Sequence, residues 1–300
     1  MFDFAFLIEV VVGGLLSGIM YSLVALGFVL IYKASGVFNF AQGAMVFFAV
    51  LSFVGFMELG LPFWAALPVT ILLMVVTGMA TERFVLRPLV SQSEDTLLMA
   101  TIGLGFVIEG TAQLAWGVDV RRLDLGVQDE PIGWVMDRAG ILISQLDILA
   151  GVVAGIMVAS LALLFSKTKV GRGLRAVADD HAAALSVGIP LKHIWALTWA
   201  TAGIVALVAG MLWGARSGVQ FALIGVALKA LPVLIIGGFT SVPGVIVAGL
   251  IVGVVEKTAE VYAGPLVGGG IEGWLPYVLA VFFLLIRPEG LFGEKIIRRV

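Results

Sequence analysis

Long runs of apolar residues recur from end to end of this 300-residue chain and limit what it can fold into. A helix of about 20 mostly apolar residues is long enough to cross a lipid bilayer. Charged residues make up only 13% of the chain, against about 25% in a soluble domain. The sequence therefore predicts an all-α, polytopic bundle of transmembrane helices with about eight or nine spans, some of them broken, in one domain over residues 1–300. The predicted spans are 7–32, 37–59, 62–81, 96–116, 141–165, 195–215, 219–239, 242–262 and a short one at 272–286.

The distribution of positive charge predicts how the chain is oriented. If residue 1 lies outside, most of the Lys and Arg residues fall in segments on the cytoplasmic side, as the positive-inside rule requires. The first residues lack the positive region of a secretory signal and run into an apolar stretch too long for one. We therefore expect an uncleaved first helix, an external N-terminus and a cytoplasmic C-terminus.

Two polar segments lie outside the predicted spans. Residues 117–140 are expected to form an external, periplasmic loop, either a short lid or docking surface or a plain solvated loop. On the cytoplasmic side, residues 166–194 include an alanine-rich stretch at 172–187 without proline, which should be helical. Gly188 suits the position just past the end of a helix, and Pro190 prevents its continuation. We expect this helix to lie at the cytoplasmic surface.

Several kinds of chemistry lack support in the sequence. Without cysteine there is no disulfide, thiolate nucleophile or cysteine-ligated metal. The sequence contains no GxxxxGK[ST] phosphate loop, HExxH zinc motif or GxSxG elbow, and its two histidines, His181 and His193, are 12 residues apart. No basic stripe suggests nucleic-acid binding. An enzyme, metal or cofactor site is therefore unsupported, which leaves a channel, a secondary transporter or the membrane subunit of a larger pump.

Two charged residues, Glu109 and Lys229, fall inside predicted spans. On an insertion scale each charge costs about 2.5–3.5 kcal/mol at a helix centre, so each requires a partner or water. One interpretation is structural: Glu109 and Lys229 face each other in an interhelical ion pair, or the stem of the Lys side chain snorkels. The others are that Glu109 lines a substrate path or acts as a proton-coupled carboxylate.

Two short polar interruptions join apolar runs: GVFNFAQG at 36–43 and GGFTSVPG at 237–244. Each begins and ends with Gly and carries small polar side chains that can bond to backbone groups freed by unwinding. Irregular backbone at membrane depth survives only where it is buried or lines water, and interruptions in both halves of a transporter point to its site. The alternative is that both are ordinary turns at the cytoplasmic face.

The polar side chains of these interruptions are candidates for contact with a transported molecule. Together with Glu109, they would line or gate a path and give hydrogen-bond partners to a polar cargo that has shed its water. Buried contacts that only brace the broken helices would look the same in the sequence. The predicted substrate-binding residues are Asn39, Gln42, Glu109, Thr240 and Ser241.

Glycine pairs spaced four residues apart recur within the apolar runs. Such pairs let helix backbones approach closely in lipid, so we expect them to act in packing. The pairs are Gly14/Gly18, Gly151/Gly155, Gly210/Gly214 and Gly249/Gly253.

Several stretches together resemble a known family. Residues 21–45, YSLVALGFVLIYKASGVFNFAQGAM, are similar to the signature of the inner-membrane permease subunits of branched-chain (hydrophobic) amino acid ABC importers, in which an aliphatic run leads into a G-V-x-N-F-A-x-G segment. The resemblance covers nearly the whole chain in the expected order. It continues through RPL at 87–89, TIGLGFVIEG at 101–110, GRGLRAVADDHAAALSVGI at 171–189, GVALKALPVLIIGGFTSVPGVIVAGLIVGVVE at 225–256 and RPEGLFG at 287–293.

The resemblance implies a multi-pass protein of the bacterial inner (plasma) membrane that pairs with a second permease subunit, homologous or identical. A periplasmic substrate-binding protein would deliver the cargo, and two cytoplasmic ATP-binding subunits would drive its transport. The missing phosphate loop fits this division of labour, because the chain would then need no ATPase site or cofactor of its own.

The resemblance also implies a role for the polar cytoplasmic segment, which is similar to the coupling helix by which ABC permeases dock into a groove of the ATPase. Aspartates would pair with basic groups on the partner, alanines would allow close approach, and a glycine would end the helix. The glutamate of the family consensus is replaced here by Ala182, so its contact would need one of the aspartates. The residues that would carry this role are Asp179, Asp180, Ala183, Ala184 and Gly188.

The motifs do not identify the cargo. Relatives often carry an amide where this chain has Glu109, so the cargo can differ from plain leucine, isoleucine or valine. Urea, short amides and aromatic acids are handled by close relatives. A self-sufficient secondary transporter or channel, suggested by the charges of Glu109 and Lys229, is the alternative from another class of protein.

Overall fold

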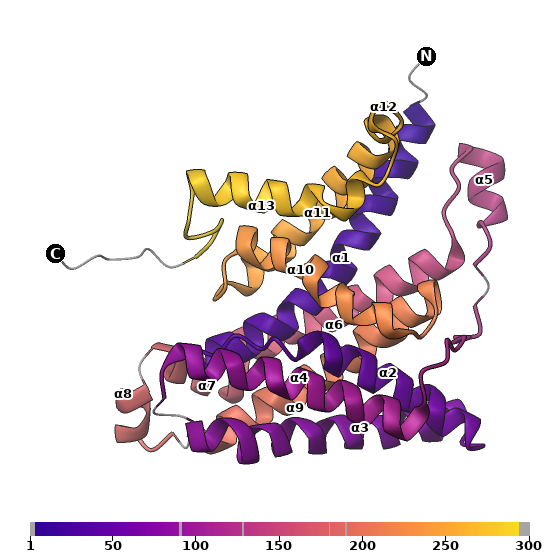
Figure 1. Cartoon of the computed structure of the whole chain (residues 1–300). Helices are drawn as coiled ribbons and strands as arrows, with labels where there is room; N and C mark the ends of the chain where they lie inside the picture. The colour runs from indigo at the N-terminus through magenta and orange to yellow at the C-terminus, as the bar shows by residue number, and fades with distance from the viewer. Residues whose placement is uncertain (1–3, 90–91, 128, 180, 190, 294–300) are drawn as a thin grey trace. The chain divides into compact units, whose positions relative to one another are not determined.

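The computed structural model describes residues 4–89, 92–127, 129–179, 181–189 and 191–293 (Figure 1). The regular structure in these ranges is helical, apart from two isolated antiparallel bridges, Arg121 with Val219 and Pro131 with Ser144. The expected all-α class is therefore confirmed. The α-helices are α1 (Phe4–Ser35), α2 (Gln42–Glu58), α3 (Phe63–Ala80), α4 (Glu94–Trp116), α5 (Gly133–Ala139), α6 (Gln145–Lys167), α7 (Lys169–Asp179), α8 (His181–Ser186), α9 (Leu191–Ser217), α10 (Ile224–Gly237), α11 (Val242–Tyr262), α12 (Gly264–Val267) and α13 (Leu275–Ile286).

Six helices within the described residues are long and apolar enough to cross a membrane. They are α1, α3 with its continuation to Leu89, α4, α6, α9 and α11. The three remaining predicted spans correspond to shorter apolar helices: α2 with 17 residues, the segment Phe221–Gly237, and α13 with 12 residues. The structure thus supports a multi-pass membrane protein with six candidate spans.

The chain divides into two compact units. Unit 1 contains Met1–Ala25, Asp124–Ala159 and Lys229–Val300, and unit 2 contains Leu26–Leu123 and Ser160–Leu228. Three helices, α1, α6 and α10, contribute residues to both units. The expected organisation as one domain over the whole chain stays a prediction.

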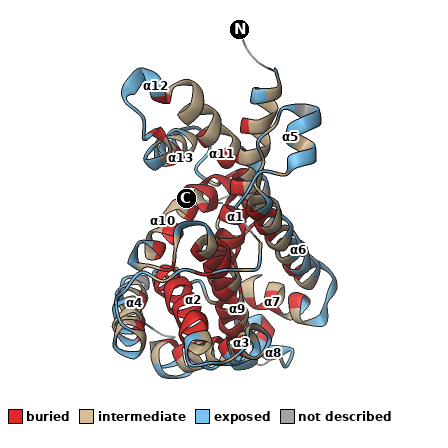
Figure 2. Ribbon diagram, turned by 90° about the vertical axis from the view of Figure 1, so that its right-hand side faces the viewer, coloured by how far each residue is buried: buried red, intermediate tan, exposed pale blue. Residues whose placement is uncertain are grey.

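The core of unit 2 is formed by α2, α3 and α9, which pack on one another. Every residue in the α2 segment Gln42–Gly55 is buried, and α2 is red over most of its length in Figure 2. Trp199 of α9 is buried too. Glycine lets α3 and α9 approach closely, since a Cβ atom on Gly203 would lie 2.8 Å from the carbonyl oxygen of Met74. A helix that is apolar on every side is best accommodated when other helices surround it, which accounts for the central place of α2 in this unit.

The end of α3 is fixed by an ion pair. The helix continues into a π-helical turn, η1 (Thr81–Leu86), and a 3-10 turn, η2 (Arg87–Leu89). The buried carboxylate of Glu82 accepts two hydrogen bonds from the guanidinium of Arg87, at 3.0 and 2.7 Å. A bidentate pair of this kind fixes both side chains, so Arg87 of the RPL motif anchors the end of this candidate span.

A close crossing of α1 and α11 organises unit 1. A Cβ atom on Gly14 would lie 2.7 Å from the Cα atom of Val254, and one on Gly18 would lie 3.0 Å from the Cα atom of Leu250. The two backbones therefore touch at this crossing. The close helix contact expected of the glycine pairs is confirmed here for Gly14/Gly18 and Gly249/Gly253.

The other two predicted glycine pairs also lie at helix contacts. Gly155 of α6 faces Ile19 of α1, where an added Cβ atom would lie 3.3 Å from the Cδ1 atom. Gly210 of α9 faces the carbonyl oxygen of Val46 on α2, at 2.7 Å from an added Cβ atom. These glycines therefore act in helix packing, as the sequence predicts.

Candidate functional site

The first polar interruption, in unit 2, is a break between two helices. Helix α1 ends at Ser35, Gly36 has a left-handed φ of +69°, and α2 begins at Gln42. Glycine adopts such a φ without steric cost. Asn39 is fully buried within the break: its Oδ1 accepts a hydrogen bond from the N–H of Ala41 (3.1 Å), and its Nδ2 donates to Oε1 of Gln42 (3.1 Å). The Asn39 amide therefore holds the irregular backbone in shape.

Thr101 of α4 braces the same break, a role that sequence reasoning missed. Its hydroxyl accepts a hydrogen bond from the N–H of Phe40 (3.4 Å) and lies 3.1 Å from the carbonyl oxygen of Phe38, to which it can donate. Thr101 is buried. The only signal in the sequence was its place at the start of the TIGLGFVIEG motif.

Gln42 carries a spare hydrogen-bond donor. Its side chain is fully buried, and its Nε2 has no hydrogen-bond partner in the part of the chain that the structure describes. The amide packs on Gly27 of α1, where an added Cβ atom would lie 3.1 Å from Cδ of Gln42. An unpaired buried donor is costly, and the predicted contact of Gln42 with a transported molecule stays a prediction.

Glu109 lies half-buried on α4. Its Oε1 accepts a hydrogen bond from Nε2 of Gln113, one turn further along the same helix, at 3.3 Å. A carboxylate accepts about four hydrogen bonds, so Glu109 keeps capacity for a further partner. Its predicted place in a substrate path stays a prediction.

The second interruption, in unit 1, joins α10 to α11. Helix α10 ends at Gly237, and Gly238 has a φ of +100°. Ser241 caps α11, because its Oγ accepts a hydrogen bond from the N–H of Gly244 at 3.0 Å. Thr240 beside it is half-buried. GGFTSVPG is therefore a helix end, a turn and a capped helix start.

The RPEGLFG segment packs against the backbone of this second interruption. The N–H of Leu291 donates to the carbonyl oxygen of Ile236 at 2.7 Å. A Cβ atom on Gly238 would lie 3.0 Å from the backbone nitrogen of Gly293. Glycine is thus needed at position 238 both for its φ and for space, and two separate family motifs meet at this turn.

Replacing Ser241 by Ala should destabilise the protein by about 1 kcal/mol, because the N–H of Gly244 loses its cap. Thermal unfolding of the purified protein in detergent measures this change. The control is Ser241→Thr, which keeps the hydroxyl and should unfold near the wild-type temperature. An Ala variant as stable as the wild type would show that the cap does not hold the start of α11.

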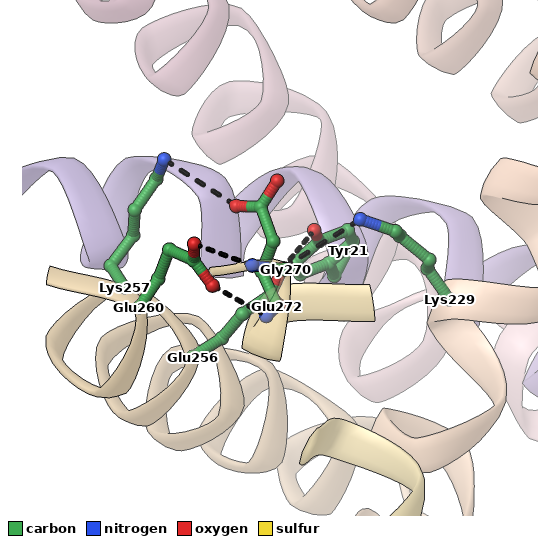
Figure 3. A network of polar contacts seen from close by, with 7 residues as sticks. All are labelled: Tyr21, Lys229, Glu256, Lys257, Glu260, Gly270 and Glu272. Carbon is green, nitrogen blue, oxygen red and sulfur yellow. Dashed lines mark hydrogen bonds and ion pairs between the residues drawn. The ribbon is translucent and has the colours of Figure 1, made fainter. Parts of the chain in front are cut away.

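A network of charged side chains lies in unit 1 (Figure 3). The carboxylate of Glu256, on α11, is buried, and its Oε1 accepts a hydrogen bond from the hydroxyl of Tyr21 at 3.0 Å. The Nζ of Lys229, on α10, lies 3.8 Å from the same oxygen. Lys229 therefore pairs with Glu256 on another helix, whereas Glu109, the partner considered from the sequence, contacts Gln113. Sequence reasoning overlooked Glu256, although it lies inside a predicted span, the feature that singled out Glu109.

The other charged side chains of the network have hydrogen-bond or ion-pair partners of their own. The carboxylate of Glu260 accepts hydrogen bonds from the backbone N–H groups of Gly270 (2.9 Å) and Glu272 (3.0 Å). The Nζ of Lys257 lies 3.8 Å from Oε2 of Glu272. These contacts tie the loop between α12 and α13 to α11.

The end of the polar segment expected on the cytoplasmic side has the predicted geometry. Gly188, in unit 2, has a φ of +83°, and its N–H donates to the carbonyl oxygen of Leu185 at 3.0 Å. The N–H of Ile189 donates to the carbonyl oxygen of Ala184, also at 3.0 Å. This is the Schellman arrangement in which a glycine just past the last helical residue ends a helix. The position predicted for Gly188 is thereby confirmed.

The other predicted coupling residues differ in their surroundings. Asp179 is the last residue of α7, which begins at Lys169, three residues before the expected start, and Asp180 lies outside the described residues. On α8, Ala183 is exposed, whereas Ala184 is only 2% exposed. Ala184 is covered by the chain itself, so of these two alanines Ala183 is the exposed one.

A groove of about 570 Å³ lies between α7 and the turn that follows α8. It is mostly apolar, with cationic side chains among the residues that line it. Its lining includes Lys169, Arg172, Gly173, Ala176, Gly188 and Ile194. The segment therefore offers both a capped helix end and a recess with positive charge beside it.

Together these features define a polytopic membrane transport protein. Apolar helices long enough to span, two glycine-bounded interruptions and charged side chains within candidate spans belong to that class. Residues 10–286 match the family model described as the branched-chain amino acid transport system / permease component. The chain belongs to this family of permease components.

Curated relatives match over nearly their whole length. The chain is 28% identical to the high-affinity branched-chain amino acid transport system permease protein BraD of Pseudomonas aeruginosa, over 98% of each chain. It is 25% identical to the corresponding protein LivH of Salmonella typhimurium, over 99% of each chain. A probable branched-chain amino acid transport permease protein LivH of Methanocaldococcus jannaschii is 25% identical, over 94% of this chain and 91% of the relative. The family resemblance of the sequence motifs is thereby confirmed.

Proposed function

We propose that this chain is the membrane-spanning subunit of an ATP-driven importer that translocates branched-chain or other hydrophobic amino acids. The observation that carries the proposal is the match of residues 10–286 to the permease family. Relatives that are similar over nearly their full length are named as permeases of high-affinity branched-chain amino acid transport systems. Their names support the same class of cargo for this chain.

In the proposed assembly the chain crosses the bacterial inner (plasma) membrane about eight or nine times, with the shorter apolar helices as broken or short spans. Its N-terminus lies outside and its C-terminus in the cytoplasm. It pairs with a second permease subunit, homologous or identical, and receives cargo from a periplasmic substrate-binding protein. Two cytoplasmic ATP-binding subunits supply the energy, so the chain needs no ATPase site of its own.

We further propose that the segment from α7 to Gly188 is the part that docks on an ATP-binding subunit. The exposed Ala183 and the helix end at Gly188 support this role, because both present backbone and small side chains to a partner. Asp179 and Asp180 would pair with basic groups on that partner. The buried Ala184 would pack α8 against the rest of the chain.

The Gly188→Arg variant should lower ATP-driven uptake about tenfold or more, because a new cation would face the basic groups expected on the ATP-binding subunit. The measurement is uptake of labelled leucine by membrane vesicles, together with co-purification of the ATP-binding subunits. The control is Gly60→Arg: Gly60 also has a positive φ, of +95°, and an added Cβ there meets no described atom within 4 Å.

If Gly188→Arg and Gly60→Arg lose the same amount of uptake, the cause is backbone strain at a residue with a left-handed φ. If Gly188→Arg leaves both uptake and complex formation unchanged, the coupling assignment is wrong.

The five predicted path residues receive unequal support. Gln42 has an unpaired N–H, and Glu109 has spare capacity to accept hydrogen bonds, which supports contact with cargo. Asn39 and Ser241 already bind backbone N–H groups of their own segments, which supports a bracing role. Thr240 is half-buried beside Ser241. We propose that all five line or gate the path, the last three partly by shaping its backbone.

A urea, short-amide or aromatic-acid permease of the same family is the alternative that Glu109 favours. The ligand of the cognate periplasmic binding protein distinguishes this alternative from an amino acid permease, because that protein determines which molecule reaches the permease. Calorimetric titration of that protein with leucine, urea, acetamide and benzoate measures its affinity for each of these ligands. Retention of urea or acetamide, and not leucine, would replace the proposed cargo.

A further inference from the structure

The ion pair between Glu256 of α11 and Lys229 of α10 leaves both charged groups with unused hydrogen-bonding capacity. The Nζ of Lys229 lies 3.8 Å from Oε1 of Glu256, beyond the reach of about 3.2 Å that a hydrogen bond requires. The other carboxylate oxygen, Oε2, is buried and has no hydrogen-bond partner among the described residues. An ammonium has three donors and a carboxylate accepts about four hydrogen bonds, so much of this capacity is unfilled.

A partly satisfied charge pair is a costly element in an apolar helix. The Glu256 side chain is only 5% exposed, and α11 is a candidate membrane span. A buried ion pair scarcely offsets its own desolvation, so apolar side chains would hold these helices together at least as well. Ionisable residues kept within spans are therefore best explained by a functional use.

The two members of the pair are held with different firmness. Glu256 is fixed by the hydroxyl of the buried Tyr21 on α1, and the backbones of α1 and α11 touch at Gly14 and Gly18. The Lys229 side chain is 34% exposed and ends a flexible four-carbon stem. Lys229 can therefore swing away from Glu256 while the carboxylate stays in place.

The surrounding charged groups have contacts of their own. Lys257 lies beside Glu272, and Glu260 accepts backbone hydrogen bonds, as Figure 3 shows. Glu256 and Lys229 thus contact each other as one negative and one positive charge.

We propose that Glu256 and Lys229 form the recognition pair for a zwitterionic amino acid during translocation, an inference that rests on the proposed function. The α-ammonium of the cargo donates to the unpaired Oε2 of Glu256, and the α-carboxylate accepts from the ammonium of Lys229. One internal ion pair is exchanged for two, so the net charge of the site stays at zero. Urea and neutral amides carry neither charge and cannot replace the internal pair.

The test uses the complete transporter, with both permeases, the ATP-binding subunits and the binding protein, reconstituted in proteoliposomes. Leucine uptake is measured per folded complex for Glu256→Gln, Lys229→Met and the double variant. Loss of a charge-assisted contact to the cargo should reduce uptake about tenfold or more in all three. ATP hydrolysis stimulated by the binding protein, measured in parallel, should fall less than uptake.

The double variant separates recognition from a structural ion pair. If the ion pair only held the helices together, removing both charges would also remove the cost of burying them, and uptake would be restored. Uptake near the wild-type level in the double variant would therefore overturn the inference. This holds even if the single variants fold poorly. The matched control is Lys257→Met, which removes the neighbouring cation of α11 and should leave uptake close to the wild-type level. A wild-type complex that moves no leucine would instead refute the proposed function.

Discussion

The Gly18→Leu variant is expected to abolish accumulation of folded protein. Its Cβ atom alone would lie 3.0 Å from the Cα atom of Leu250 on α11, so the side chain has no space unless the two helices separate. Overpacking costs about 1–3 kcal/mol where neighbouring side chains can shift, and a helix backbone cannot yield in the same way. Against a total stability of about 5–15 kcal/mol, separating α1 from α11 removes most of the folded state. Yield from membranes and size-exclusion profile in detergent measure the loss.

The matched control is Gly13→Leu on the same helix. An added Cβ at Gly13 meets no described atom within 4 Å, so this variant should accumulate like the wild type. Normal yield and profile for both variants would contradict a close backbone crossing at Gly18.

The Asn39→Leu variant should also lose stability heavily. Leucine has a similar volume but leaves the N–H of Ala41 and the amide of Gln42 without the partners that Asn39 supplies. Each unsatisfied buried group costs about 1–3 kcal/mol, and Asn39 is fully buried. Folded yield and thermal unfolding in detergent should fall, and leucine uptake should fall at least in proportion to the folded fraction.

The control for Asn39 is Gln113→Leu, which breaks a half-buried amide contact to Glu109 on α4 and should have a much smaller effect on folding. Loss of transport without loss of stability in Asn39→Leu would change the role assigned to Asn39. If the variant folds with wild-type stability but transports poorly, Asn39 contacts the cargo and does not brace the break.

Local features of this fold could be predicted from the sequence. Gly188 sits at the end of an alanine-rich polar stretch, and its role depends on only a few neighbouring residues, so its Schellman geometry followed from the pattern. The glycine pairs of α1 and α11 likewise mark faces of a helix through a fixed spacing. Apolar run length also predicted an all-α membrane protein.

Run length overestimated some helices. The predicted span 37–59 begins inside the first interruption, where Asn39 satisfies the backbone in an irregular form, and α2 starts only at Gln42. Hydropathy does not register such a break, because the residues around Asn39 remain apolar. Hydropathy therefore misplaces the start of such a helix.

Contacts between distant segments could not be predicted. Thr101 binds backbone groups of Phe38 and Phe40 from another helix, and no spacing within the chain connects them. The partner of Lys229 was equally hidden, since any charge within a span was a possible candidate. Glu256 became the partner only through the way α10 and α11 pack in unit 1.

The central claim, that this chain is the permease of an ATP-driven importer, is tested most directly by reconstitution. Proteoliposomes contain either the chain alone or the complete assembly with the second permease, the ATP-binding subunits and the external binding protein, and uptake of labelled leucine is followed. We predict uptake by the complete assembly only when ATP is supplied to the ATP-binding subunits, and no uptake by the chain alone under an imposed proton or sodium gradient. Gradient-driven leucine uptake by the chain alone, without ATP, would contradict the account and identify a self-sufficient secondary transporter.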